Sequence, residues 1–566
     1  MIKADLTSFR FDAQSGVYLH PYYAQAKFDY TDGLEVEGRI YNILKDTEDL
    51  GIFSEELASR ITDWPTEYHF SPTRHNLLRH FHFKKTDQIL ELGCGCGAVT
   101  RQLGETGASV TAIEGSLSRA RCAAQRTRDL QNVSVCTSNF QDIEFDKKYD
   151  YVTLIGVFEY CPIYFKGDDP ISECLEVVKS ALKPGGKLII AIENRLGLKY
   201  FAGIEEDHVG KPFFGIQDLY NRNTAVTFGK VELSSLLEKN GFCSIEFQYP
   251  FPDYKVPRVV FMESAFNNPG FRPAEIIRQL PSRDYSKKAT HLFSENLVWP
   301  VLDANKLIPD LSNSFLVITG LEEAHPAEPA LIAACYTLDR VMKYNVKTEF
   351  IEDDKKHIIV KKSAFIESVE PDPVLIHRLD DERYCPGRNL DAEISKMIYE
   401  DDFEGYVAKI REWIDFVIKK GIKDANDEDI YRSTVIPEFI DCIPPNLIIT
   451  PDGMVYIDRE WKFMKDFSLT SLLLRYLVYP KQAEFINRHL KGKGLPCGKL
   501  LNFIGIKIND EIYREFMVVY DKILESVYPK TVSAASPQWG KLDSLKGILN
   551  LRLLIQKMKS RFRNIK

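Results

Sequence analysis

The stretch over residues 88–114 constrains the fold more than any other part of the chain, and it reads QILELGCGCGAVTRQLGETGASVTAIE. A short apolar run at 89–90 predicts a buried strand that ends at 91–92, and residues 98–103 predict a helix. Three glycines at alternate positions separate the two: Gly93, Gly95 and Gly97. Such a turn lets the backbone approach a ligand closely, and the helix start offers free N–H groups to an anion. The pattern predicts a ligand site at a strand-to-helix turn of an α/β sheet.

A second predicted strand, 110–113, ends on Glu114, whose carboxylate is placed to accept hydrogen bonds from ribose hydroxyls. The glycine spacing together with Glu114 also fits the dinucleotide fingerprint, which would make the chain an oxidoreductase. Two places before the first glycine, however, stands Glu91. A carboxylate there suits a cofactor that carries an ammonium group and is unfavourable beside a pyrophosphate. The stretch therefore predicts a nucleoside cofactor and favours one with an ammonium group.

Two later segments point to a known family. Residues 139–142 (Asn-Phe-Gln-Asp) follow a third predicted strand, and Leu-Lys-Pro-Gly-Gly-Lys at 182–187 leads into a fifth. With Glu91 and the glycine turn, these segments resemble the class I S-adenosylmethionine-dependent methyltransferases. The resemblance implies a doubly wound, Rossmann-like α/β domain of seven strands over residues 86–320, closed by an antiparallel strand at 314–319. It also implies S-adenosylmethionine as the cofactor, held by Glu91, Gly93, Gly95, Gly97, Glu114, Phe140 and Asp142.

The flanking segments supply candidates for the rest of this site. Residues 1–85 form a lead-in, in which Tyr68 and Arg74 either reach the cofactor or belong to a helix that only caps the sheet edge. The polar loop 193–211 follows the fifth strand, on the side where doubly wound sheets bind ligands. Within it, His208 is a candidate general base for an acceptor hydroxyl, oriented by Asp207 or Glu206. Alternatively, His208 only binds the acceptor or caps a helix.

The second half of the chain, 331–540, changes character. Asp441 precedes Asn446 by five residues, and a turn at 450–453 leads to Asp458. This block resembles the catalytic centre of protein-kinase-like phosphotransferases, including the aminoglycoside-kinase branch. The resemblance implies an α+β domain that binds Mg-ATP. In it Asp441 is the catalytic base, Asn446 and Asp458 bind metal, Lys361 pairs with the phosphates and Glu393 supports that lysine.

Two departures weaken the kinase-like pattern. Phe439 stands where a histidine usually precedes the catalytic aspartate, and no glycine occurs between Gly320 and Gly387, so the phosphate-covering glycine loop is absent. A catalytically inactive module that docks a partner is the alternative.

The last segment, 541–566, carries eight basic residues against one acidic residue, with leucines at helical spacing. A basic amphipathic helix in a chain of net charge −8 predicts binding to an anionic membrane surface or an acidic protein partner. The overall charge argues against nucleic acid as a partner. Eleven cysteines without a C-x-x-C pair indicate reduced thiols and a cytoplasmic protein, located peripherally at the inner face of the membrane if the helix binds there.

The three parts together resemble bifunctional enzymes of bacterial surface-polysaccharide assembly. The resemblance implies a methyltransferase that acts on a glycan or a glycan phosphate and carries a second, phosphotransferase activity. The alternative is a methyltransferase with an inactive kinase-like module that acts on a small molecule or a protein.

Overall fold

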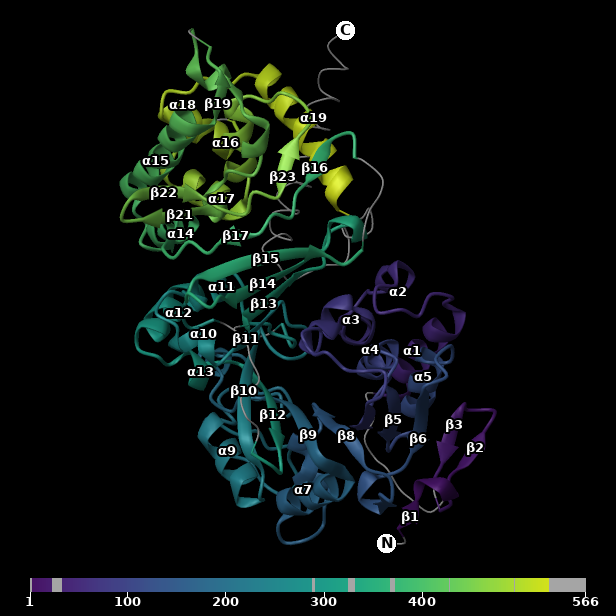
Figure 1. Cartoon of the computed structure of the whole chain (residues 1–566). Coiled ribbons are helices and arrows are strands. Elements are labelled where there is room, and N and C mark those ends of the chain that lie inside the picture. Colours follow the sequence, from purple (N-terminus) through teal and green to yellow (C-terminus); the bar gives the residue numbers. More distant parts are fainter. Residues whose placement is uncertain are drawn as a thin grey trace. The chain divides into compact units, whose positions relative to one another are not determined.

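A computed structural model of the 566-residue chain describes residues 3–22, 33–287, 291–323, 331–366, 372–426, 428–492 and 494–528. The chain forms two compact units (Figure 1). Unit 1 comprises residues 1–269 and 276–336, and unit 2 comprises residues 270–275 and 337–566. The predicted C-terminal helix at 541–566 lies outside the described residues. No described helix is both long enough and apolar enough to cross a membrane.

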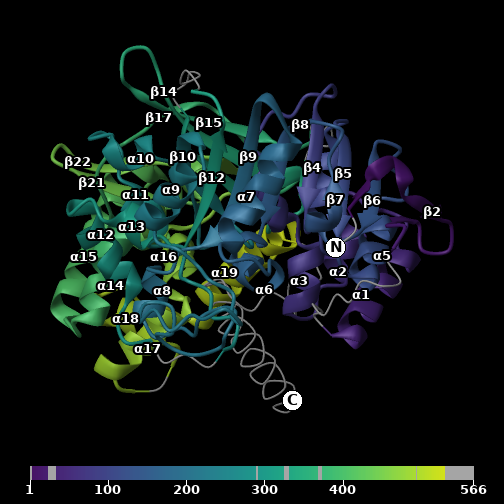
Figure 2. The ribbon, with the colours of Figure 1, turned by 90° about the horizontal axis from the view of Figure 1, so that it is seen from below.

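Unit 1 is built on the predicted seven-stranded sheet, in the order β10-β12-β9-β8-β4-β5-β6. The strands are β4 (Gln88–Leu92), β5 (Ser109–Glu114), β6 (Val133–Thr137), β8 (Tyr149–Ile155), β9 (Leu182–Glu193), β10 (Cys243–Phe251) and β12 (Ser314–Gly320). The five central strands pair in parallel, and β12 runs antiparallel to both of its neighbours, β9 and β10. Figure 2 shows β9, β8, β4, β5 and β6 in this sequence across the unit. The predicted α/β architecture and its antiparallel closing strand are confirmed.

The sheet continues beyond these seven strands at both edges. Beside β10 lie β11 (Val259–Met262) and then β13 (Leu331–Thr337), whereas β3 (Val17–Leu19) and β2 (Arg10–Asp12) extend the edge beside β6. A further short pair joins β1 (Ala4–Asp5) to β7 (Ile143–Glu144). The start of the chain therefore adds strands to the sheet, in addition to the helices that follow it.

Helices cover the sheet and place its loops. The lead-in contains α1 (Leu34–Asp46), α2 (Glu55–Ser59) and α3 (Trp64–Phe70), and the sheet helices are α4 (Ala98–Glu105), α5 (Leu117–Arg126), α7 (Pro170–Ala181) and α9 (Lys230–Lys239). The remaining helices are α6 (Cys161–Tyr164), α8 (Leu198–Phe201), α10 (Ser264–Asn267), α11 (Pro273–Ile277), α12 (Glu295–Ala304) and α13 (Ile308–Leu311). The α5 helix packs on β5 and β6, and α7 packs on β8 and β9. Ile89, Val110 and Ile189 are among the fully buried side chains of the core between the sheet and these helices.

Unit 2 has short sheets and a helical core. Its strands are β14 (Val346–Glu352), β15 (Ile358–Ala364), β16 (Leu375–His377), β17 (Glu382–Arg383), β18 (Arg388–Asn389), β19 (Ile422–Asp424), β20 (Thr434–Val435), β21 (Leu447–Thr450), β22 (Gly453–Tyr456) and β23 (Trp461–Phe463). Its helices are α14 (Leu390–Tyr399), α15 (Phe403–Gly421), α16 (Leu469–Leu477), α17 (Pro480–His489), α18 (Pro496–Phe503) and α19 (Asp510–Val527). The strands β14 and β15 form one hairpin, and β21 and β22 form another at the predicted turn 450–453. Trp413 and Leu473 are fully buried in the core.

Candidate cofactor and acceptor site

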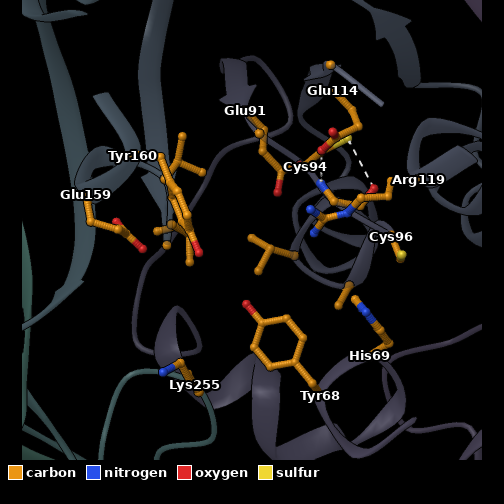
Figure 3. Close-up of a pocket in the computed structure, with 18 of the residues that line it drawn as sticks. Tyr68, His69, Glu91, Cys94, Cys96, Glu114, Arg119, Glu159, Tyr160 and Lys255 are labelled. Atoms are coloured by element: carbon orange, nitrogen blue, oxygen red, sulfur yellow. Dashed lines mark hydrogen bonds between the residues drawn. The ribbon is translucent and has the colours of Figure 1, made fainter. Parts of the chain in front are cut away.

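A cavity of about 430 Å³ opens at the carboxyl ends of β4, β5 and β8 in unit 1. Its lining comes from the glycine turn, the lead-in helix α3, the segment after β6, the segment after β8 and the insertion that follows β10. Figure 3 shows Glu91 and Glu114 on one side of this cavity, with Glu159 and Lys255 on the other and Tyr68 between them. Segments far apart in the sequence thus enclose one volume, which is large enough for a nucleoside cofactor with part of an acceptor.

The glycine turn closes against neighbouring elements with no room for side chains. All three glycines have left-handed backbones, with φ of 77° at Gly93, 55° at Gly95 and 85° at Gly97. A Cβ atom on Gly97 would lie 2.7 Å from the Cα atom of Ala123 in α5. A Cβ atom on Gly93 would lie 2.5 Å from Val157 Cγ2. Only glycine therefore fits at these positions, and the turn is fixed to the end of β5 because the N–H groups of Gly93 and Cys94 donate to the backbone oxygen of Ile113.

Glu91 is a buried carboxylate with an unused oxygen. Glu91 is only 3% exposed, and no described residue donates a hydrogen bond to its Oε2 atom. Burial raises the pKa of Glu91 to about 7, and the nearby Glu114 carboxylate contributes to that rise. A buried carboxylate oxygen without a donor is costly, and an ammonium group in the cavity would supply the charge and the hydrogen bond that Oε2 lacks. The structure therefore fits a cofactor with an ammonium group at this position.

Glu114 is fixed at the end of β5 by the turn itself. Its Oε2 atom accepts a hydrogen bond from the backbone N–H of Gly95 at 2.8 Å, and its Oε1 atom accepts one from Ser116 at 2.9 Å. Each carboxylate oxygen can accept a second bond, so the group can still receive ribose hydroxyls. The structure thus brings Glu91, Glu114 and the glycine turn together.

The other predicted cofactor residues divide into two groups. Tyr68, Arg74 and Phe140 line the cavity, whereas Asp142 is not among the lining residues and its carboxylate lies 3.3 Å from the side-chain nitrogen of Asn139. Arg74 is 2% exposed and donates to the Tyr68 hydroxyl at 3.1 Å and to the backbone oxygen of Tyr254 at 2.9 Å. The lead-in therefore does more than cap the sheet edge, because Arg74 connects it through a hydrogen bond to Tyr254, in the segment that follows β10.

His208 sits among three carboxylates. Its Nδ1 atom lies 2.9 Å from Glu206 Oε1, and its Nε2 atom lies 3.5 Å from Glu159 Oε1 and 3.7 Å from Glu193 Oε2. Burial alone would lower the pKa of His208, but the carboxylates of Glu193, Glu159 and Glu206 together raise it well above its usual value. A protonated imidazole cannot accept a proton, so this environment does not support the predicted role of His208 as a general base.

Two lysines complete the charged wall. Lys255 Nζ lies 2.5 Å from Glu193 Oε1 and 2.7 Å from Asp207 Oδ1, and Lys199 Nζ lies 2.7 Å from Asp207 Oδ2. These lysines hold the pKa of Asp207 well below its usual value, although burial acts in the opposite direction. Both carboxylate oxygens of Asp207 thus form ion pairs with lysines, and Glu206 rather than Asp207 orients His208.

Sequence reasoning assigned no role to Glu159, Glu193 or Lys255. A signal existed for the two glutamates, because Glu159 follows β8 closely and Glu193 is the last residue of β9. The carboxyl ends of parallel strands are where doubly wound sheets bind ligands. Lys255 comes from the insertion after β10, whose path cannot be deduced from local patterns.

In unit 2, Asp441 precedes the β21-β22 hairpin and Asp458 follows it. The side chain of Asn446 donates to Asp441 Oδ2 at 2.9 Å, and Arg475 Nη2 lies 2.5 Å from Asp441 Oδ1. Asp458 forms an ion pair with Lys362, and its backbone has a left-handed φ of 58°. Such a conformation is uncommon for a residue other than glycine and clusters at functional sites.

The structure does not bring Lys361 and Glu393 together. Lys361 is exposed on β15, whereas the side chain of its neighbour Lys362 is 4% exposed and reaches Asp458. Glu393 pairs instead with Arg388 at 3.2 Å. Lys362 therefore occupies the place beside Asp458 that the sequence analysis gave to Lys361.

Comparisons with known proteins identify the first unit. Residues 90–188 match the family described as a methyltransferase domain. The ubiquinone biosynthesis O-methyltransferase of Rickettsia bellii is 31% identical over 118 residues, which are 21% of this chain and 46% of that protein. The protein of the same name from Hydrogenovibrio crunogenus is 28% identical over 137 residues, covering 24% of this chain and 54% of that protein. The chain thus spans about half the length of the curated relatives that it matches.

Solved structures show weaker similarity. A Haemonchus contortus phosphoethanolamine N-methyltransferase 2 in complex with S-adenosyl-L-methionine is 18% identical, with a TM-score of 0.27, and the match covers 50% of this chain and 60% of that one. A SAM-dependent methyltransferase from Archaeoglobus fulgidus is 17% identical, with a TM-score of 0.28, and the match covers 45% of this chain and 96% of that one. At these TM-scores the structures add nothing to the sequence match.

Unit 1 thus contains a methyltransferase domain of the S-adenosylmethionine-dependent type. The family match includes the glycine turn, so it favours the methyl donor over the dinucleotide that the glycine spacing left open.

Proposed function

We propose that the protein transfers a methyl group from S-adenosylmethionine to an oxygen of a glycan or glycan phosphate in the biosynthesis of a surface polysaccharide. The observation that carries the methyl-donor part is Glu91, a buried carboxylate with an unused oxygen beside a turn that only glycine fits. The glycan acceptor rests on the resemblance of the whole chain, a methyltransferase followed by a kinase-like region, to enzymes of polysaccharide assembly.

Some residues of the cavity would bind the cofactor, and others would bind the acceptor. When bound, S-adenosylmethionine supplies a methyl group on a positively charged sulfur. Glu91 would hold the ammonium group, Glu114 the ribose and Phe140 the adenine. The acceptor then enters from the side of Glu159 and Lys255, and the buried walls exclude water from the reacting atoms. A phosphate oxygen is already an anion, whereas an acceptor hydroxyl must also lose a proton.

A small-molecule hydroxyl is the second candidate acceptor, because the curated relatives are named for ubiquinone biosynthesis. A radiolabel assay separates the candidates. The full chain is incubated with S-adenosylmethionine that carries a labelled methyl group, and three acceptors are compared: a phosphorylated glycan, the same glycan after phosphatase treatment, and a catechol. Label on the phosphorylated glycan alone supports the glycan-phosphate proposal. Label on the catechol alone refutes it, and no label on any acceptor refutes both candidates.

For unit 2 we propose a kinase-like phosphotransferase that binds Mg-ATP through Lys362, Asn446 and Asp458, with Asp441 as the base. The Lys362–Asp458 pair beside the β21-β22 hairpin supports this proposal. The ion pair between Asp441 and Arg475 favours the alternative, an inactive module, because it occupies the carboxylate that would accept the proton.

Calorimetric titration of Mg-ATP into the protein saturated with S-adenosylmethionine distinguishes these alternatives. If Lys362 pairs with the phosphates, Lys362→Met is expected to weaken binding by at least about tenfold, while Lys361→Met on the opposite face of the same strand binds like wild type. Equal loss in both variants would restore Lys361 to the site. No binding to wild type at millimolar nucleotide would favour the inactive module.

A further inference from the structure

We propose that Glu159, Glu193 and His208 form a binding site for a divalent transition-metal cation of the Mn²⁺ or Zn²⁺ type on the acceptor side of the cavity. One ligand atom from each residue lies within 4.8 Å of the other two: a carboxylate oxygen from each glutamate and a ring nitrogen from His208. Glu159 and His208 line the cavity, so a cation held there would face the acceptor. A mixed set of carboxylate and imidazole ligands is typical of these cations.

The spacing of the three groups fits a cation better than direct hydrogen bonds. His208 Nε2 is 3.5 Å from Glu159 and 3.7 Å from Glu193, whereas a charge-assisted hydrogen bond would place such atoms about 2.8 Å apart. Two ligands that each lie about 2.1 Å from one metal are separated by about 3.0 to 3.4 Å in octahedral or tetrahedral geometry. The two distances from His208 Nε2 would need to shorten by about 0.1 to 0.7 Å.

The buried carboxylates are short of partners. Glu193 is 0% exposed and Glu159 is 1% exposed. No described residue donates a hydrogen bond to the Oε2 atom of either side chain, although Lys255 lies close to the other oxygen of Glu193. Buried carboxylate oxygens are normally satisfied by donors or by metal ions. The oxygens that face the imidazole nitrogen are Oε1 of Glu159, from the turn after β8, and Oε2 of Glu193, at the end of β9.

His208 is oriented as metal-bound histidines usually are. Its Nδ1 atom lies 2.9 Å from Glu206 Oε1, so an Nδ1–H group can donate to that carboxylate. A cation that displaces the Nε2 proton would then be bound by the Nε2 lone pair, on the side of Glu159 and Glu193. A carboxylate behind the histidine fixes its tautomer and increases its basicity as a ligand. Glu206 itself is held by the backbone N–H groups of His208 and Val209, at 2.9 Å and 2.7 Å.

The excess of negative charge on this wall also favours a bound cation. Four carboxylates (Glu159, Glu193, Glu206 and Asp207) face two lysines (Lys199 and Lys255) across the ion pairs described above. One divalent ion that displaces the Nε2 proton of His208 would balance them. The ion would also let an acceptor oxygen, from a phosphate or a hydroxyl, bind beside a wall that otherwise repels anions. This acceptor role rests on the proposed methyl transfer, whereas cation binding does not.

Titration with Mn²⁺ alone tests the site. The full chain is stripped with a chelator and kept free of nucleotide, and free Mn²⁺ is followed by electron paramagnetic resonance. Wild type is expected to bind one tight Mn²⁺ that excess Zn²⁺ displaces. Glu159→Gln keeps the shape of the side chain while removing a buried charge, so it is expected to fold and to lose this binding. His208→Ala is expected to lose it as well, and Glu206→Gln to weaken it about 10- to 100-fold. Glu176→Gln, an exposed glutamate of α7, is the matched control.

The possible results distinguish failure of the metal site from failure of the proposed methyl transfer. No Mn²⁺ binding to wild type below about 1 mM, or binding to Glu159→Gln and His208→Ala as tight as to wild type, overturns the site. Methyl transfer that proceeds equally with and without chelator overturns the acceptor role. Mn²⁺ bound at the site without methyl transfer to any acceptor leaves the metal site standing and counts only against the proposed function.

Discussion

Glu91→Gln is expected to stabilise unit 1 while weakening its cofactor site. Burial raises the pKa of Glu91 to about 7 from its ordinary value of 4.5. A raised pKa means that the folded state favours the protonated carboxyl, so the free energy of unfolding falls as the pH rises from about 4.5 to about 7. The shift corresponds to about 3 kcal/mol at pH 8, and a glutamine side chain avoids this cost. Below about pH 4.5 the variant and wild type should be equally stable, because both side chains are then neutral.

The same carboxylate should make cofactor binding depend on pH. If an ammonium group returns the pKa of Glu91 to its ordinary value, affinity should rise about eightfold between about pH 6 and about pH 7.5 and then level off. Glu91→Gln should bind more weakly at the upper pH and show no such slope. S-adenosylhomocysteine is the suitable ligand, because it carries the ammonium group but no methyl to transfer.

Two measurements check this reasoning. Calorimetry gives the affinity for S-adenosylhomocysteine at each pH, and urea denaturation gives the stability. Because a chain of two units need not unfold in one step, stability is taken from the transition that the ligand shifts. Glu176→Gln, whose side chain is 66% exposed, is the control and should change stability by less than about 1 kcal/mol. A Glu91→Gln variant no more stable than wild type at pH 8, or a wild-type affinity that does not change with pH, would refute the argument.

Two further predictions concern the glycine turn and the end of the chain. Gly97→Ala combines a left-handed φ of 85° with a Cβ atom 2.7 Å from Ala123, whereas Gly241→Ala has a φ of 79° and open space. In thermal unfolding, backbone strain should lower the free energy of unfolding of both variants by about 1–2 kcal/mol. Gly97→Ala should lose additional stability through the steric clash and should bind the cofactor weakly. Equal effects in the two variants would show that the close approach to Ala123 is unimportant. Removal of residues 541–566, which carry eight basic side chains, should abolish sedimentation with anionic vesicles, and unchanged sedimentation would leave an acidic protein as the candidate partner.

The sheet of unit 1 could be predicted because each of its strands carries its own signal. The runs 89–90 and 188–192 are apolar, lie near glycine turns and are buried on both faces, so these strands can be predicted without knowledge of their neighbours. The edge strands β2 and β3 are only three residues long, and their strand character comes from pairing with each other and with β6. Composition alone does not indicate such pairing.

The lysine of unit 2 shows how a small error in a strand changes a predicted site. The sequence-based prediction chose Lys361, which lies on β15 next to Lys362. Successive side chains of a strand point to opposite faces, so a choice one residue away selects the wrong face. Lys362 reaches Asp458, while Lys361 points to solvent. Two adjacent lysines cannot be distinguished until the pairing of the strand is known.

The two halves of the cavity also differ in how far they can be predicted from the sequence. The cofactor half, from Glu91 to Glu114, lies within one strand–turn–helix–strand segment, so its chemistry follows from local order along the chain. The acceptor half is assembled from strand ends and loops between Tyr68 and Tyr285, and each of its residues looks ordinary in isolation. Glu159, Glu193 and His208 acquire a function only when the fold brings them within 4.8 Å of one another. A cation there would explain why three buried carboxylates surround one histidine at the entrance for the acceptor.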